Sequence, residues 1–132
     1  MKCIVAGGRD FNDQQLFDAG IAEFLLHYNA ITSVISGGCA SGTLTHVTKD
    51  GRKVYGADGM GEAWAEKNNI PVITFLPEYD KYPPNVAPVM RNESMAQAAN
   101  ALLLYFDGSS KGSTDMLKRA KRHGLYIHIV NY

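Results

Sequence analysis

The chain has 132 residues, and its 13 basic and 13 acidic side chains give a formal net charge of zero. That length suits one domain with a substantial buried core. Balanced charge without a long basic run argues against a nucleic-acid partner and an anionic membrane surface.

No segment approaches the ~18 apolar residues of a membrane-spanning helix. The start, MKCIVAGG, lacks the pattern of a secretory signal. Cys3 and Cys39 have no metal-ligand spacing, so we expect reduced thiols, no metal and a cytoplasmic protein.

The first half of the chain alternates between strand and helix patterns. CIVAG (3–7) predicts a strand, and SVIS (33–36) predicts a second one that ends at Gly37-Gly38. Between them we expect a helix over about 13–28 with Asn12 or Asp13 as its N-cap. Its apolar residues recur at spacings of three and four: Leu16, Phe17, Ile21, Phe24, Leu25 and Tyr28.

The segment between the second strand and the next helix breaks this alternation. Residues 43–48 and 52–55 are rich in β-forming side chains, and they flank Lys49-Asp50-Gly51. Asp-Gly is a strong hairpin signal. We therefore predict a small inserted hairpin at about 43–55, at the end of the sheet where ligands bind.

The second half of the chain resumes the alternation of helices and strands. A helix is expected over about 57–68, followed by a strand, PVITFL (71–76), and a loop with four prolines. The remaining elements are a helix over about 89–99, a strand ALLLYF (101–106), a helix over about 113–123 closed by Gly124, and a strand YIHIVN (126–131).

This order predicts one α/β domain over residues 1–132. Strands that alternate with helices and are apolar throughout belong to a parallel sheet covered on both faces. Right-handed crossovers then give a Rossmann-like three-layer sandwich with a five-stranded, mostly parallel sheet.

Glycine-rich and polar turns follow four of the five predicted strands. Ligands of open parallel sheets bind at the carboxyl ends of the strands, where glycines and helix N-termini suit phosphate. Each turn alone could equally be a tight connection, Asp58 and Asp115 could be ordinary first-turn helix residues, and Arg91 could pair with Glu93 or Asp58. Taken together, these turns predict a phosphate or pyrophosphate site. Its candidate residues are Gly7, Gly8, Arg9, Asp10, Ser36, Gly37, Gly38, Gly56, Asp58, Glu62, Arg91, Asn92, Gly112, Ser113, Thr114 and Asp115.

Four stretches carry a resemblance to a known family. GGRDF, ISGG…GADGMGEAWAE, MRNESMAQAANALLLYFDG and SKGSTDMLKRAKRHG together resemble the YspA/YpsA-related branch of the SLOG superfamily, over nearly the whole chain. This resemblance implies a Rossmann-like fold, binding of nucleotides or nucleotide-derived ligands, and a homo-oligomer. The LOG group of the superfamily consists of phosphoribohydrolases, which cleave the N-glycosidic bond of nucleoside monophosphates.

The resemblance also assigns roles to particular residues. Arg91 precedes Met95 at the spacing of the LOG motif, and residues 112–115 (GSTD) match its G-T-x-E, so Asp115 falls at the position of the catalytic Glu. Glycines 37, 38 and 56 resemble the phosphate-contacting turn. The chain departs from the pattern in having Asp for Glu, Ser113 for Thr, and the inserted hairpin between SGG and GAD.

Two functions are consistent with these observations. The first is a binding module that senses, carries or sequesters a nucleotide or an ADP-ribose-like molecule, with Arg9 and Arg91 holding phosphate and no cofactor. The alternative is a nucleotide phosphoribohydrolase with Arg91 and Asp115 catalytic and Glu62 or Asp58 as a second acid.

Overall fold

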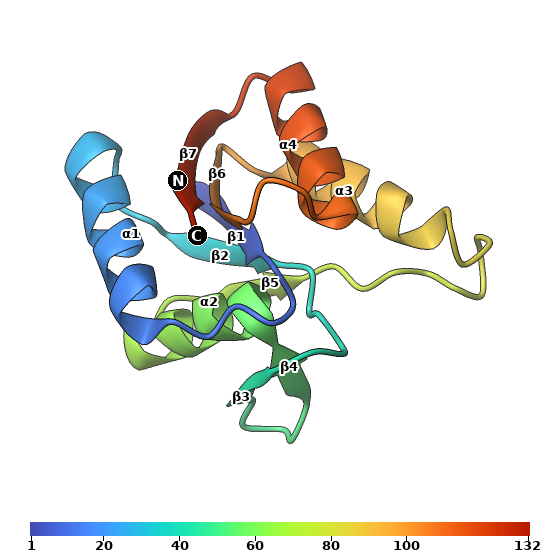
Figure 1. Ribbon diagram of the computed structural model, residues 1–132, viewed down its shortest axis with the longest axis horizontal. Coiled ribbons are helices and arrows are strands. Elements are labelled where there is room, and N and C mark those ends of the chain that lie inside the picture. The colour runs from blue at the N-terminus through green and yellow to red at the C-terminus, as the bar shows by residue number, and fades with distance from the viewer.

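A five-stranded, all-parallel sheet forms the centre of the computed structural model, which describes residues 1–132 (Figure 1). The strand order is β5-β2-β1-β6-β7. The strands are β1 (Lys2–Gly7), β2 (Ser33–Ser36), β5 (Val72–Thr74), β6 (Ala101–Phe106) and β7 (Tyr126–Asn131). The helices are α1 (Gln14–His27), α2 (Gly56–Lys67), α3 (Ala87–Ala98) and α4 (Lys111–Arg122). The predicted fold class is therefore confirmed.

Two helices cover each face of the sheet, with α1 and α2 on one side and α3 and α4 on the other (Figure 1). Alternate residues of β1 and β6 divide between two apolar clusters, as expected for strands with both faces covered. Val5 and Leu103 pack with α1 and α2, whereas Ile4 and Leu102 pack with α3 and α4.

The chain reverses its direction of winding between β1 and β6. These strands are neighbours in the sheet, with Cys3 opposite Ala101 and Gly7 opposite Tyr105. The segment after β1 leads to α1 on one face, and the segment after β6 leads to α4 on the other. The two connections diverge at this switch point and leave a crevice above the strand ends, where ligands of this architecture bind.

The predicted hairpin is present as a separate antiparallel pair, β3 (Leu44–Val47) and β4 (Lys53–Tyr55). Gly51 has φ +88°, so the Asp-Gly turn uses the left-handed conformation that glycine tolerates. The pair lies beside the beginning of α2 (Figure 1), and Thr45 Oγ1 donates to Gly56 O at 2.7 Å.

Most predicted boundaries lie within two residues of those in the structure. Asp13 is the N-cap of α1, because its carboxylate accepts from Leu16 N at 3.0 Å. Gly124 follows α4 with φ +69°. The strand predicted over 71–76 is shorter than expected, since β5 is an edge strand that pairs only with β2.

Neither cysteine forms a disulfide, and burial raises the pKa of the Cys3 thiol to about 12. None of the helices combines the length and apolarity needed to cross a membrane.

Candidate functional site

A cavity of about 1010 Å³ lies above the strand ends at the switch point. Eleven of the predicted site residues line it: Gly7, Gly8, Arg9, Asp10, Gly37, Gly38, Asp58, Arg91, Asn92, Gly112 and Ser113. The turns after β1, β2 and β6 thus meet around one space, as the sequence predicted. Its volume is at the upper end of ordinary small-molecule sites, which span roughly 300–1,000 Å³.

The turn after β1 is held closely against the start of α2. Gly8 O accepts from Ala57 N at 3.1 Å and from Phe11 N at 3.2 Å. Gly56 has φ +59°, and a Cβ there would collide with the backbone of Gly8 and Arg9. Gly56 therefore permits this close packing, and it does not itself line the cavity.

The turn after β2 is fixed by two carboxylates of α2. Ser36 Oγ donates to Glu62 Oε2 at 2.7 Å and accepts from Gly38 N at 3.0 Å. Asp58 Oδ2 accepts from Cys39 N at 3.1 Å. Ser36 and Glu62 lie beneath the cavity wall, whereas Asp58 forms part of it.

Asp58 is 8% exposed, and its ionisation is strongly perturbed. Burial raises the pKa of its carboxyl from 3.8 to about 6, and the negative charge of Glu62 adds to this effect. The positive charge of Arg91 and the hydrogen bond from Cys39 N oppose it. Asp58 is thus a buried acid that exchanges a proton near neutral pH.

Arg91 is held by two neutral acceptors. Its Nη1 donates to Gly37 O at 2.7 Å, and its Nε donates to Asn92 Oδ1 at 3.0 Å. Asn92, 5% exposed, donates in turn from Nδ2 to Asp115 Oδ2 at 2.9 Å. The predicted pair Arg91 and Asp115 is therefore connected through a buried amide.

Asp115 itself does not line the cavity. Its Oδ2 also accepts from Arg119 Nε at 3.0 Å, and Arg119 Nη1 donates to Glu93 at 2.9 Å. The side chain belongs to the contact between α3 and α4. Thr114 likewise lies outside the cavity lining, and its hydroxyl donates to Ser110 O at 2.8 Å.

The beginning of α4 supplies backbone donors to the cavity wall. Thr114 N, at 2.9 Å from Ser110 O, is the first amide of the helix with a backbone partner. The amides of Lys111, Gly112 and Ser113 precede it and lie at the positive end of the helix dipole. Asp107 Oδ1 accepts from Ser109 N and Ser110 N, which fixes the loop before the helix.

The cations and the carboxylates on the cavity wall differ in whether they already have partners within the chain. Arg9, Arg91 and Lys111 line it, and none of them forms an ion pair. The carboxylates on the same wall already have donors within the chain: Asp10 from Thr43 Oγ1, Asp58 from Cys39 N, and Asp107 from two amides. The three cations are therefore available to bind an anionic ligand.

Sequence reasoning missed several lining residues, most of them apolar. They come from the proline-rich loop, from α3 and α4 and from the chain end, and include Leu76, Pro77, Tyr79, Pro88, Met95, Met116 and Tyr132. The loop was expected at this edge of the sheet, but its individual residues carry no motif. Cys39, Ala40 and Ser41 also line the cavity and could have been found as the continuation of the Gly37-Gly38 turn.

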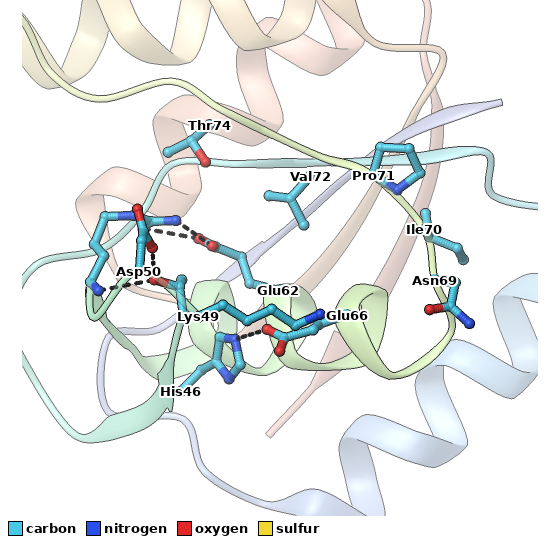
Figure 2. Close-up of a pocket in the computed structure, with 12 residues that line it drawn as sticks. His46, Lys49, Asp50, Glu62, Glu66, Asn69, Ile70, Pro71, Val72 and Thr74 are labelled. Atoms are coloured by element: carbon cyan, nitrogen blue, oxygen red, sulfur yellow. Dashed lines mark hydrogen bonds and ion pairs between the residues drawn. The ribbon is translucent and has the colours of Figure 1, made fainter.

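A second cavity of about 580 Å³ lies between the hairpin, α2 and β5 (Figure 2). Glu62 and Glu66 point toward it from α2, and His46 reaches Glu66 with Nε2 at 3.0 Å from Oε2 (Figure 2). His46 therefore faces this second cavity, not the larger one. Glu62 also accepts from Arg52 Nη2 at 2.5 Å.

Comparison with known proteins adds no family assignment: no family model, no curated protein and no solved structure matches the chain.

Proposed function

We propose that the larger cavity binds a nucleotide or a nucleotide-derived, ADP-ribose-like ligand, and that the protein senses, carries or sequesters it. The observation that carries this proposal is the set of three cations without carboxylate partners, Arg9, Arg91 and Lys111, around one cavity. Cations left unpaired beside backbone amides at a helix N-terminus suit phosphate oxygens.

The rest of the wall suits the remainder of a nucleotide. Leu76, Tyr79 and Met95 offer apolar surface for a base. The carboxylates of Asp10 and Asp107 can accept hydrogen bonds from ribose hydroxyls, since each has an oxygen that no side chain or amide of the protein occupies. The resemblance to the SLOG superfamily supports the same ligand class.

Calorimetry against AMP, ADP, ATP and ADP-ribose tests the proposal. Arg91→Met removes a charge-assisted hydrogen bond to phosphate, so we expect affinity to fall about 10- to 100-fold. Arg122→Met is the matched control, because Arg122 is an exposed arginine of α4 away from the cavity. Failure of the wild-type protein to bind any of the four at millimolar concentration would refute the proposal.

The alternative, a nucleotide phosphoribohydrolase, is favoured by one observation. Asp58 lies on the cavity wall, and its pKa of about 6 suits a group that donates or accepts a proton near neutral pH. Asp115, the catalytic acid implied by the resemblance, lies behind Asn92, and Glu62 is occupied by Arg52 and Ser36. Release of free base from nucleoside monophosphates is the direct assay. Activity that survives both Asp58→Asn and Asp115→Asn would exclude acid catalysis by either residue.

The resemblance also leads us to propose a homo-oligomer, and the reduced cysteines a cytoplasmic location. Light scattering coupled to gel filtration tests the first. Fractionation of cells that express the protein tests the second.

A further inference from the structure

The inserted hairpin contributes one side chain to the buried polar network beneath the larger cavity. Arg52 precedes β4, and its guanidinium donates to both oxygens of Glu62, at 2.5 Å to Oε1 and 3.4 Å to Oε2. Glu62 is 2% exposed, so its carboxylate depends on this cation for charge compensation. Dashed lines in Figure 2 end on Glu62, where it points from α2 toward the hairpin.

The charge on Glu62 decides how Ser36 is oriented. An ionised carboxylate only accepts hydrogen bonds, so the Ser36 hydroxyl must donate its proton to Glu62 Oε2 at 2.7 Å. The hydroxyl oxygen is then free to accept, and it accepts from Gly38 N at 3.0 Å. Arg52, Glu62 and Ser36 thus form a directed chain that ends on the backbone of the turn.

That turn forms one wall of the larger cavity. Gly38 has φ +60°, and a Cβ at this position would lie 3.2 Å from Arg52 Nη1. Gly37 O, one residue earlier, accepts from Arg91 Nη1 at 2.7 Å. Any shift of the turn therefore changes both the backbone that faces the cavity and the acceptor that holds Arg91.

We propose that Arg52 is a positioning residue, through which the inserted hairpin sets the conformation of the Gly37-Gly38 turn and so the affinity of the cavity for its ligand. The part concerning affinity rests on the proposed nucleotide-binding function. Arg52 does not line the larger cavity, so it acts through Glu62 and Ser36 and not by contact with the ligand. The insertion thereby helps to set the geometry of the site without contacting the ligand.

The experiment compares Arg52→Met with the double variant R52M/E62Q, and uses Lys53→Met as control. Lys53 is the exposed neighbour of Arg52 in the same hairpin. Two quantities are measured: the amide chemical shifts and hydrogen exchange of Gly38 without ligand, and the dissociation constant for AMP and ADP-ribose. Thermal melting confirms that each variant is folded, and Arg52→Gln, which also removes the positive charge, replaces Arg52→Met if that variant does not fold.

In Arg52→Met we expect a shifted Gly38 amide with faster exchange, and affinity weakened on the order of tenfold, as for other residues that hold a binding group in place. The double variant should return both the Gly38 amide and the affinity most of the way to their wild-type values. Glu62→Gln removes the uncompensated charge and leaves an amide oxygen that still accepts from Ser36. Lys53→Met should change neither quantity.

Different results overturn different statements. An unchanged Gly38 amide in Arg52→Met, or no recovery in the double variant, overturns the positioning role. A shifted Gly38 amide with unaltered nucleotide affinity overturns the effect on the ligand. If Gly38 responds as expected but the wild-type protein binds no nucleotide, the positioning role is upheld and the proposed function fails.

Discussion

Asp58→Asn tests the electrostatics of the cavity wall most directly. The substitution keeps the shape of the side chain and an oxygen that can accept from Cys39 N, but it removes the negative charge. Burial raises the pKa of Asp58 from 3.8 to about 6 in the folded protein. The native state therefore retains this proton up to a higher pH than the unfolded chain does. Hence the contribution of Asp58 to the free energy of unfolding falls as pH rises from 3.8 to about 6.

The magnitude follows from that difference in pKa. Each unit corresponds to about 1.4 kcal/mol, so the ionised Asp58 lowers the free energy of unfolding by about 3 kcal/mol at pH 7 and above. Asp58→Asn should remove this loss. We expect the variant to be more stable than the wild type by up to ~3 kcal/mol at pH 8, or about 10 °C in Tm. Below pH ~4 both side chains are neutral, and the gain should disappear.

Urea denaturation of both proteins at several values between pH 4 and pH 8 measures this difference. Asp80→Asn is the control, since Asp80 is exposed in the loop between β5 and α3. A variant less stable than the wild type at pH 8 would mean that the attraction of the nearby positive charge of Arg91 for ionised Asp58 outweighs the cost of burial. A gain that does not vary with pH would refute the assigned protonation of Asp58.

Three further predictions concern the cavity and its surroundings. Bound phosphate should raise the pKa of Asp58 further, so ligand binding should take up a proton above pH 6 and weaken as pH rises. Calorimetry in buffers of different ionisation enthalpy measures this proton uptake, and Asp58→Asn should abolish it. Asp115→Ala should weaken binding about tenfold, because Asn92 then loses the acceptor that orients it toward Arg91. Asp115→Asn should bind normally, since one amide oxygen can accept from both Asn92 and Arg119. Equal loss of affinity in the two variants would contradict this role. Gly56→Ala should lower the free energy of unfolding by about 3 kcal/mol in urea, because the new Cβ meets the backbone of Gly8 and Arg9.

The fold could be predicted from the sequence because its signals are local. The spacing of Phe17, Ile21 and Phe24 places them on one face of α1, and all three are buried. Asp50-Gly51 predicted the hairpin through the conformation of a single turn. The short β5 could not be predicted, because its length depends on its one partner, β2, and not on its own composition.

The candidate site was predicted less completely. The strand order brings the glycine turns together, so Gly37, Gly112 and Arg91 could be placed at one cavity. The pairing of Asp115 with Arg119 is an i, i+4 contact within α4 and could have been expected from spacing. The contact of Arg52 with Glu62 could not, because it depends on how the hairpin docks against α2.

The bond from Arg91 to Gly37 O joins residues 54 positions apart in the chain. By contrast, Arg52 and Glu62 are 10 positions apart. Loop closure costs more entropy over the longer separation, so the hairpin side of the cavity can assemble from a short segment, whereas Arg91 arrives only when α3 docks across the sheet. A nascent chain that ends before α3 would carry the glycine turns after β1 and β2, but neither this arginine nor the turn after β6. Under the proposed function, ligand binding would therefore require α3 to have docked, and a bound ligand would report that both halves of the sheet have come together.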